Sequence, residues 1–133
     1  MPSNLTIQTA LIAYLKTKPT ILAVVPAVEI REDQWQGTEF SYPCVRVKMM
    51  SNRPKDTNCD VSEVMFAIQI FSQLDSSIEA EQIADIINVA LHARSFESGG
   101  IRLSCYTNNL APAIRQDVRT WRSEVLMRAT ATG

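Results

Sequence analysis

The stretch that decides the fold is VSEVMFAIQIFSQLDSSIEAEQIADIINVALHAR, residues 61–94. In its first part, large apolar side chains occupy every second position: Val64, Phe66, Ile68 and Ile70. The positions between them hold Met65, Ala67, Gln69 and Phe71. Because neighbouring side chains of a strand point to opposite faces, this alternation predicts a β-strand with one strongly apolar face. We expect a helix to cover that face.

The second part of the stretch predicts the covering helix. Ser76 is followed three residues later by Glu79, a spacing typical of a capping box, in which each side chain binds a backbone N–H at the helix start. One arc of the helix predicts the buried face: Ala80, Ile83, Ala84, Ile87, Ala90 and Leu91. Ile78 and Val89 lie outside this arc, which hints at a second surface that a neighbouring subunit covers.

The composition indicates one domain without a strong charge. A chain of 133 residues fits a single domain, and a net charge of −1 lacks the basic excess typical of nucleic-acid-binding proteins. Cys44, Cys59 and Cys105 are odd in number and form no CxxC pair, so we expect neither a disulfide framework nor a zinc site, and a reducing cytoplasm fits best. Residues 5–15 are apolar but interrupted by Thr and Gln, which argues against a signal peptide or a membrane span.

The remaining chain predicts another helix and several strands. A helix over residues 4–17, capped by Ser3 or Asn4, places these apolar residues at helical spacing: Leu5, Leu11, Ile12 and Leu15. Pro19 ends this helix, and a short turn is expected before Pro26. Further strands are expected at residues 28–31, 44–50, 101–106 and within 118–130.

The segments between these elements are expected to be irregular. Residues 51–60 predict the extended tip of a hairpin, residues 96–100 a flexible exit from the helix, and residues 107–117 a polar connection. The predicted fold class is α+β, with residues 1–133 as a single domain. It has a mixed, largely antiparallel sheet of about five strands and two main helices packed on one face.

One helix face imitates a metal site. Glu81, Asp85, Asn88 and His92 stack along one side of the predicted helix. No second cluster of His, Cys or acidic residues completes a coordination sphere, so a solvated helix face is the favoured interpretation. His92 is the only histidine, and the sequence has no phosphate-binding glycine motif and no nucleophile motif. We therefore expect no catalytic residue, no metal and no cofactor.

Charged and aromatic residues suggest contacts with other proteins. The C-terminal quarter is basic, through Arg115, Arg119, Arg122 and Arg128. The loop after the predicted strand at 28–31 is acidic, through Glu29, Glu32, Asp33 and Glu39. Such segregated charges can steer one subunit onto another. The same loop contains Trp35, Phe40 and Tyr42, which are either interface anchors or lids on the core.

The order of parts resembles the tail completion proteins of long-tailed bacteriophages, which include tail terminators and head-to-tail joining proteins. The resemblance rests on IQTALIAYLKTKPTILAVV, YPCVRV, VMFAIQIFS, EAEQIADIINVAL and TWRSEVLMRA. It implies a hexameric ring at the head-proximal end of the tail, which stops polymerisation of the tail tube and joins it to the neck. The implied partners are further copies of the chain, the tail tube protein and a neck or head completion protein.

The resemblance also implies a non-enzymatic virion protein without a cofactor, assembled in the host cytoplasm with no membrane partner. DNA would pass through the lumen of the ring without being read. No catalytic residue is carried over, only the roles of the Trp35 loop and the hairpin tip at residues 53–60 as contact segments. The interface candidates are Trp35, Phe40, Tyr42, Arg53, Lys55, Asp56, Arg119, Arg122 and Arg128.

An alternative function is a small-molecule-binding regulatory α+β domain, because fold does not fix function. That function requires a concave apolar pocket with convergent polar groups.

Overall fold

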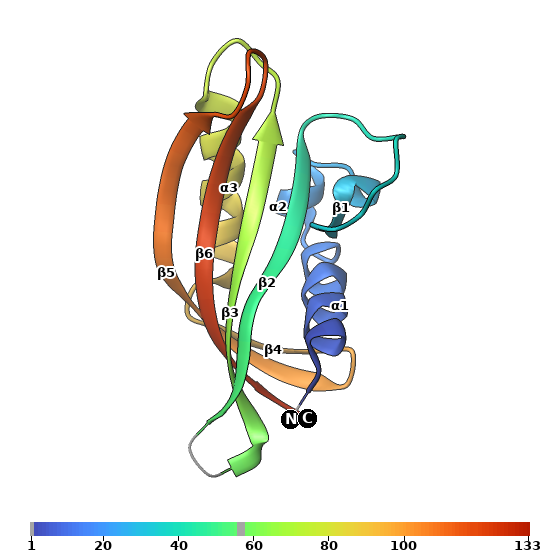
Figure 1. Ribbon diagram of the computed structural model, residues 1–133, viewed down its shortest axis with the longest axis vertical. Coiled ribbons are helices and arrows are strands. Elements are labelled where there is room, and N and C mark those ends of the chain that lie inside the picture. The colour runs from blue at the N-terminus through green and yellow to red at the C-terminus, as the bar shows by residue number, and fades with distance from the viewer. Residues whose placement is uncertain (1, 56–57) are drawn as a thin grey trace.

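Strand β3 (Asn58–Ser72) lies in the middle of a six-stranded sheet in the computed structural model, which describes residues 2–55 and 58–133. The strands lie in the order β1-β2-β3-β6-β5-β4. Only β1 and β2 are parallel, and every other neighbouring pair is antiparallel (Figure 1). The other strands are β1 (Ile30–Glu32), β2 (Cys44–Lys55), β4 (Arg94–Ser98), β5 (Ile101–Arg115) and β6 (Trp121–Thr132). The predicted α+β class and mixed sheet are confirmed.

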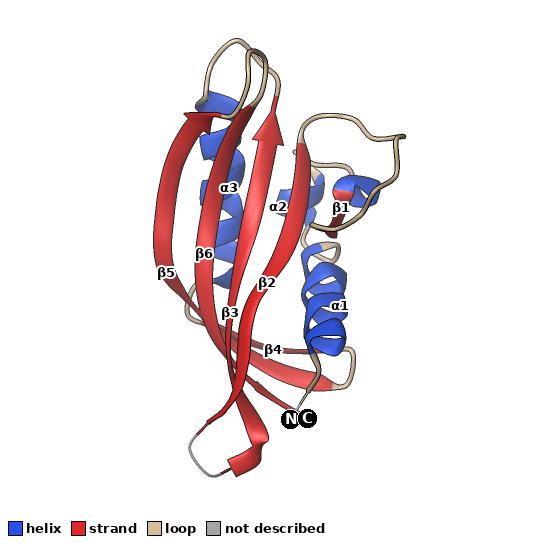
Figure 2. Cartoon of the chain, viewed as in Figure 1, coloured by secondary structure: helices blue, strands red, loops and turns tan. Residues whose placement is uncertain are grey.

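The two main helices cover one face of this curled sheet. Helix α3 (Ile78–Leu91) contacts β3, β5 and β6, whereas α1 (Asn4–Leu15) contacts β1, β2 and β4. Two short helical segments, α2 (Pro19–Leu22) and η1 (Ala27–Glu29), lead from α1 to β1. Figure 2 shows α3 behind the sheet, while the opposite face of β3, β5 and β6 has no helix over it. We call this second side the bare face.

The core forms where the apolar face of β3 meets α3, as the alternation predicts. Phe66 and Ile68 are fully buried and pair across the sheet with Met127 and Val125 of β6. The α3 residues of the predicted arc are buried with them: Ala80, Ile83, Ala84, Ile87 and Leu91. Ala90, which was predicted in this arc, is only partly buried. Each large aliphatic side chain buried here contributes about 1.5–3 kcal/mol before chain entropy is counted.

Strand β5 is much longer than predicted. The polar connection expected at residues 107–117 is wrong up to Arg115, because β5 continues to that residue. The pairing of β5 with β6 is irregular at two places, Thr107/Asn109 and Ala111/Ile114. These irregularities explain why the sequence of this strand resembles a polar loop. A β-bulge tolerates polar residues and a proline that a regular central strand would exclude, and Pro112 lies in the second bulge.

The predicted extended hairpin tip is also wrong over most of its length. β2 continues to Lys55, with Asn52 opposite Val64 and Arg53 opposite Glu63. At the same end of the sheet, β6 pairs with β3 up to Thr132. Cross-strand pairing therefore extends the sheet well beyond the apolar segments that signal it in the sequence.

The sixth strand, β4, has no counterpart in the prediction. Residues 96–100 were expected to be a flexible exit, but β4 and β5 form a hairpin in which Ser98 pairs with Ile101. Gly99 and Gly100 both have positive φ, 59° and 80°, as the favoured two-residue hairpin turns require. Phe96 anchors β4 by stacking on Tyr14 of α1, with ring centroids 3.6 Å apart.

Of the two predicted N-terminal helix caps, only that of α1 is present in the structure. Ser3 caps α1 as predicted, because its Oγ accepts a hydrogen bond from the Thr6 N–H at 3.1 Å. The capping box predicted for α3 is wrong. Ser77 is the N-cap residue and makes no side-chain cap. Glu79 instead accepts a hydrogen bond from Ser72 Oγ at 2.7 Å and ties the helix start to the end of β3.

The buried stripe of α1 differs from the prediction. Leu5 is 73% exposed and Ile12 is only partly buried, so neither belongs to the fully buried face of the helix. The stripe consists of Ile7, Ala10, Leu11 and Leu15. The helix is apolar around most of its circumference, and spacing alone therefore did not fix which side faces the sheet.

Replacing Ala93 by glycine is expected to stabilise the protein. Ala93 follows the C-cap residue of α3 and has φ 56°, a left-handed conformation that costs a residue with a Cβ about 1 kcal/mol. After the greater entropy of the unfolded glycine chain is counted, Ala93→Gly should raise the free energy of unfolding by about 0.5 kcal/mol in urea titrations. The control Ala90→Gly, inside α3, should lower it by about 1 kcal/mol. Equal losses of unfolding free energy in both variants would contradict the left-handed conformation of Ala93.

The cysteine thiols provide a second test, at alkaline pH. Cys44 and Cys105 are free and buried, and burial raises the pKa of both thiols, from 9.0 to about 12 for Cys105. The unfolded thiol loses its proton near pH 9.0 and the folded Cys105 thiol only near pH 12. This contribution to stability is therefore complete below pH 9 and is lost between these values, by about 1.4 kcal/mol per pH unit. In Cys105→Ala, the free energy of unfolding should fall less steeply with pH over this range than in the wild type. The same slope in both proteins would contradict the burial of the Cys105 thiol.

Candidate interaction surfaces

Three residues of the polar stack on α3 form hydrogen bonds with β5. Glu81 Oε1 accepts a hydrogen bond from the Ala113 N–H at 3.1 Å, and His92 Nδ1 accepts one from the Thr107 N–H at 3.0 Å. Asn88 Oδ1 accepts a further bond from the Thr107 hydroxyl. These contacts lie at the two bulges of β5, where backbone N–H groups leave the regular ladder. Glu81, Asp85 and His92 are exposed, as a solvated helix face predicts, and Asn88 is half-buried, but the hydrogen bonds to β5 were not predicted.

Among residues 2–55 and 58–133, no group of three or more His, Cys, Asp or Glu side chains is placed to hold a metal ion. Within the same ranges, no helix is long and apolar enough to cross a membrane.

The aromatic residues of the loop between β1 and β2 form one cluster. The rings of Trp35 and Phe40 meet edge to face at a centroid distance of 6.4 Å, and those of Phe40 and Tyr42 at 5.5 Å. The Arg31 guanidinium lies 3.5 Å from the Trp35 ring centroid. Trp35 and Tyr42 are half-buried, whereas Phe40 is 46% exposed. The cluster thus covers the start of β2 while it presents one aromatic side chain to solvent.

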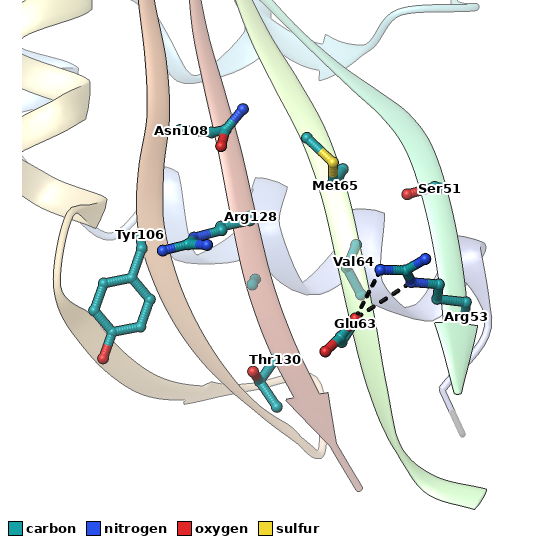
Figure 3. A pocket seen from close by; sticks show the side chains of 10 residues that line it. Ser51, Arg53, Glu63, Val64, Met65, Tyr106, Asn108, Arg128 and Thr130 are labelled. Atoms are coloured by element: carbon teal, nitrogen blue, oxygen red, sulfur yellow. Dashed lines mark hydrogen bonds and ion pairs between the residues drawn. The ribbon is translucent and has the colours of Figure 1, made fainter. Parts of the chain in front are cut away.

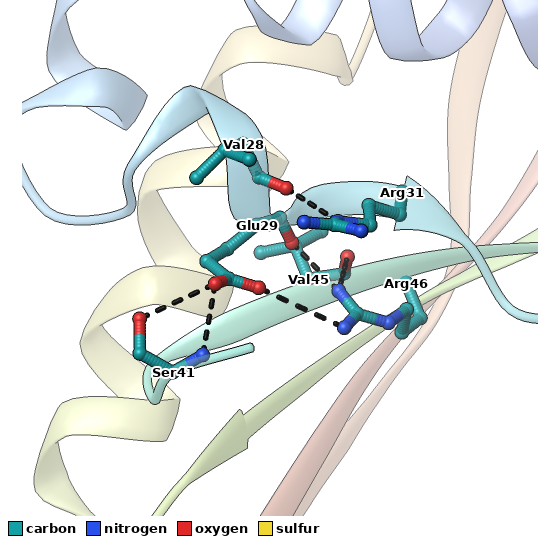
Figure 4. A network of polar contacts seen from close by, with 6 residues as sticks. All are labelled: Val28, Glu29, Arg31, Ser41, Val45 and Arg46. Atoms are coloured by element: carbon teal, nitrogen blue, oxygen red, sulfur yellow. Dashed lines mark hydrogen bonds and ion pairs between the residues drawn. The ribbon is translucent and has the colours of Figure 1, made fainter. Parts of the chain in front are cut away.

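A buried ion pair lies beneath this loop (Figure 4). Glu29 Oε1 is 3.8 Å from an Arg46 guanidinium nitrogen, and both side chains are almost fully buried. Glu29 Oε2 accepts hydrogen bonds from the Ser41 N–H at 2.8 Å and the Ser41 hydroxyl at 3.3 Å. Arg46 also donates to the carbonyl oxygens of Glu29 and Val45. Glu29 fixes the loop from inside, so it is not part of the acidic surface that the sequence predicted.

The basic residues of the C-terminal quarter lie in two places. Arg122 and Arg128 occupy bare-face positions of β6, because their neighbours Ser123 and Met127 point into the core. Arg119 lies in the turn between β5 and β6. Asp117 holds this turn by accepting hydrogen bonds from the backbone N–H groups of Arg119 and Thr120, both at 2.9 Å. The bond from Arg119 contributes most to lowering the pKa of the Asp117 carboxyl below its usual range.

The end of the β2–β3 hairpin carries the remaining candidates. Arg53 forms an exposed ion pair with Glu63 at 3.1 Å, and Lys55 is exposed at the end of β2. Asp56, the remaining candidate of this segment, lies outside the described residues. The structure brings Arg53 and Arg128 to one hollow, whereas Trp35, Phe40 and Tyr42 form a separate cluster.

This hollow lies on the bare face and measures about 590 Å³. Figure 3 shows Arg128 and Tyr106 on one side of it and the Arg53–Glu63 pair on the other. Ser51, Asn108 and Thr130 add polar groups to its lining. A small-molecule site is typically an apolar concavity, and this charged, open hollow gives the regulatory-domain alternative no support.

Glu81 and His92 thus bind the chain's own backbone, and Phe40, Lys55 and Arg128 are exposed. A family model described as "Tail completion protein gp17" matches residues 9–132. The chain therefore belongs to the tail completion protein gp17 family, which confirms the resemblance drawn from the sequence. It is a structural, non-enzymatic component of the virion's tail region.

Solved structures agree with this assignment at the level of fold. A chain of a structure titled "Virion of native gene transfer agent (GTA) particle" is 16% identical, with a TM-score of 0.73, and the match covers 96% of this chain and 95% of that chain. A second solved chain is 17% identical with a TM-score of 0.66, and the match covers 97% and 96% of the two chains. No curated protein matches the sequence.

Proposed function

We propose that the chain forms a ring, a hexamer, at the head-proximal end of the tail, where it ends polymerisation of the tail tube and joins the tail to the neck. The single observation that carries this proposal is the family match over residues 9–132. Its partners are further copies of the chain, the tail tube protein and a neck or head completion protein. DNA passes through the lumen without sequence-specific contacts.

The surfaces of the molecule suit a cyclic assembly. A ring closes through heterologous contacts, so each subunit needs two different patches that complement one another. Arg122 and Arg128 supply positive charge on the bare face, Arg119 adds one in the turn before β6, and the bare face is open to a neighbour. We assign the Trp35 cluster and the hairpin end with Arg53 and Lys55 to contacts with neighbouring subunits or the tube. Exposed aromatic and arginine side chains are the residue types that anchor such contacts.

Negative-stain electron microscopy of the purified full chain tests the ring. Six-fold rings are the expected particles, and compact monomers at every concentration would contradict the proposal.

Charge reversal tests the basic patch. Because Arg122 and Arg128 carry the positive charge of β6 on the bare face, the double variant Arg122→Glu/Arg128→Glu should dissociate the ring in light scattering. The matched control Lys16→Glu/Arg94→Glu reverses two exposed charges at the end of α1 and on β4, and its mass should equal that of the wild type. An unchanged mass in the Arg122/Arg128 variant would show that these two arginines do not contribute to the contact between subunits.

A further inference from the structure

The bare face carries unpaired positive charge. Lys48, Arg122 and Arg128 point to this side, and no acidic side chain in the described ranges forms an ion pair with them. The acidic groups on the same face are engaged within the chain. Glu63 pairs with Arg53, and Glu124 accepts a hydrogen bond from Gln69. Apolar groups lie between the charges: Met65, Leu126 and Tyr106.

The outer side of α3 has the opposite character. The helix contains Glu79, Glu81 and Asp85 but no lysine or arginine. Glu79 and Glu81 accept hydrogen bonds from other parts of the chain, while Asp85 is exposed and has no partner among the described residues.

Two aliphatic side chains flank Asp85 on this outer side. Ile78 is 59% exposed and Val89 is 67% exposed, one on each side of Asp85 along the helix. Asp85 also lines a hollow of about 520 Å³ beside α3, together with Val24 and Ile86. The helix layer therefore offers an acidic surface with apolar groups, as the bare face offers a basic one.

These two surfaces lie on opposite sides of one two-layer molecule (Figure 1). A surface that complements the far side of the same molecule makes head-to-tail contacts, which close into a ring or grow into a filament. We propose that the outer side of α3 in one copy docks on the bare face of the next copy. This inference rests on the proposed ring and names the two surfaces that form it.

In this contact Asp85 lies among the arginines of β6. Ile78 and Val89 cover the apolar residues between those arginines. Charges of opposite sign across an interface fix its orientation and exclude wrong partners, and the aliphatic groups supply the area removed from water.

The acidic loop after β1 is the competing partner for the basic patch. Without Glu29 it retains Glu32, Asp33 and Glu39. Its aromatic cluster packs against Arg46, which occupies a bare-face position of β2, so the loop borders the same side as the cations. Two complementary patches on one side favour a closed dimer over a ring. The outer side of α3 fits a cyclic assembly better.

Two variants with one damaged surface each provide the test. Asp85→Arg/Val89→Arg places positive charge on α3, and Arg122→Glu/Arg128→Glu places negative charge on β6. Each variant alone should be monomeric in native mass spectrometry, because one of its two contact surfaces repels its neighbour. A one-to-one mixture should form rings again, because each α3 surface then meets a bare face of opposite charge. A mixture that stays monomeric would contradict this pairing of surfaces.

Three further results would overturn the inference. Rings that survive in Asp85→Arg/Val89→Arg would show that α3 is not at the interface, while the ring itself stands. Loss of the ring in Glu32→Lys/Glu39→Lys, with the α3 variant intact, would assign the acidic surface to the loop. A wild-type chain that stays monomeric at all concentrations would overturn both the inference and the ring. Circular dichroism and thermal unfolding confirm that each variant is folded. Asp85→Asn replaces the α3 variant if that variant does not fold, and Arg122→Gln/Arg128→Gln replaces the β6 variant.

Discussion

Phe66→Ala is expected to lower the free energy of unfolding by about 3–5 kcal/mol, the usual cost of removing a fully buried phenylalanine. Phe66 has no exposed surface and lies at the centre of the sheet, opposite Met127 of β6. Its loss removes the apolar area that it buries and leaves a cavity that helix and sheet, held by the surrounding core, cannot fill. Urea titration followed by circular dichroism measures this loss.

Phe71→Ala is the matched control, because it removes the same side chain from the opposite face of the same strand. Phe71 is only half-buried and borders the hollow near the Trp35 cluster. Its removal should cost about 1–2 kcal/mol, since less area returns to water and no closed cavity forms. Similar losses for the two variants would mean that the helix layer does not cover the face of β3 that holds Phe66.

Glu29→Ala is expected to cost about 3 kcal/mol, because it leaves the buried Arg46 without its counter-charge. The loss should lie at the lower end of the range for buried pairs, since Arg46 keeps the carbonyl oxygens of Glu29 and Val45 as acceptors. The variant also removes the carboxylate that binds Ser41. The Trp35 loop should therefore become more sensitive to proteolysis, which limited digestion measures.

Two further variants separate the charge from the packing. Glu29→Gln/Arg46→Met removes both charges at similar volume, and it should recover part of the loss seen in Glu29→Ala. Glu63→Ala breaks the exposed pair with Arg53 and should cost less than about 1 kcal/mol, because water screens that pair. Equal losses in Glu29→Ala and Glu63→Ala would contradict the burial of the Glu29–Arg46 pair.

The core of the fold could be predicted from the sequence, but the edges of the sheet could not. The alternation around Phe66 and the spacing around Ile83 each specify one buried face, and both faces are where they were predicted. Strand β4 could not be predicted in this way, because its hydrophobic signal is a single phenylalanine, Phe96. The pair Gly99–Gly100 was the available signal for its hairpin, since two adjacent glycines favour a turn in which both residues have positive φ.

Polar contacts between different elements account for two of the other differences. The capping box failed because Ser72, at the end of β3, binds Glu79 in place of the helix start. Glu81 is exposed, as its position in the sequence indicates, but it also accepts a hydrogen bond from a backbone N–H at a bulge of β5. Neither contact can be predicted from local spacing, because the partner belongs to another element.

The interaction surfaces were predictable in part. The sequence identified the basic residues Arg122 and Arg128 and the outlying aliphatic residues Ile78 and Val89. It could not show that these two sets lie on opposite sides of the molecule, which depends on the side of the sheet that α3 covers. It also assigned Glu29 to the acidic surface, whereas the structure buries this residue beside Arg46.

Tail length in particles assembled without this chain is the most direct test of the proposal that it ends the tail. Electron microscopy of a phage with the gene deleted should show overlong tails without heads, and the wild-type gene supplied in trans should restore joined tails of uniform length. Headed particles with tails of normal length in the deletion would contradict the account.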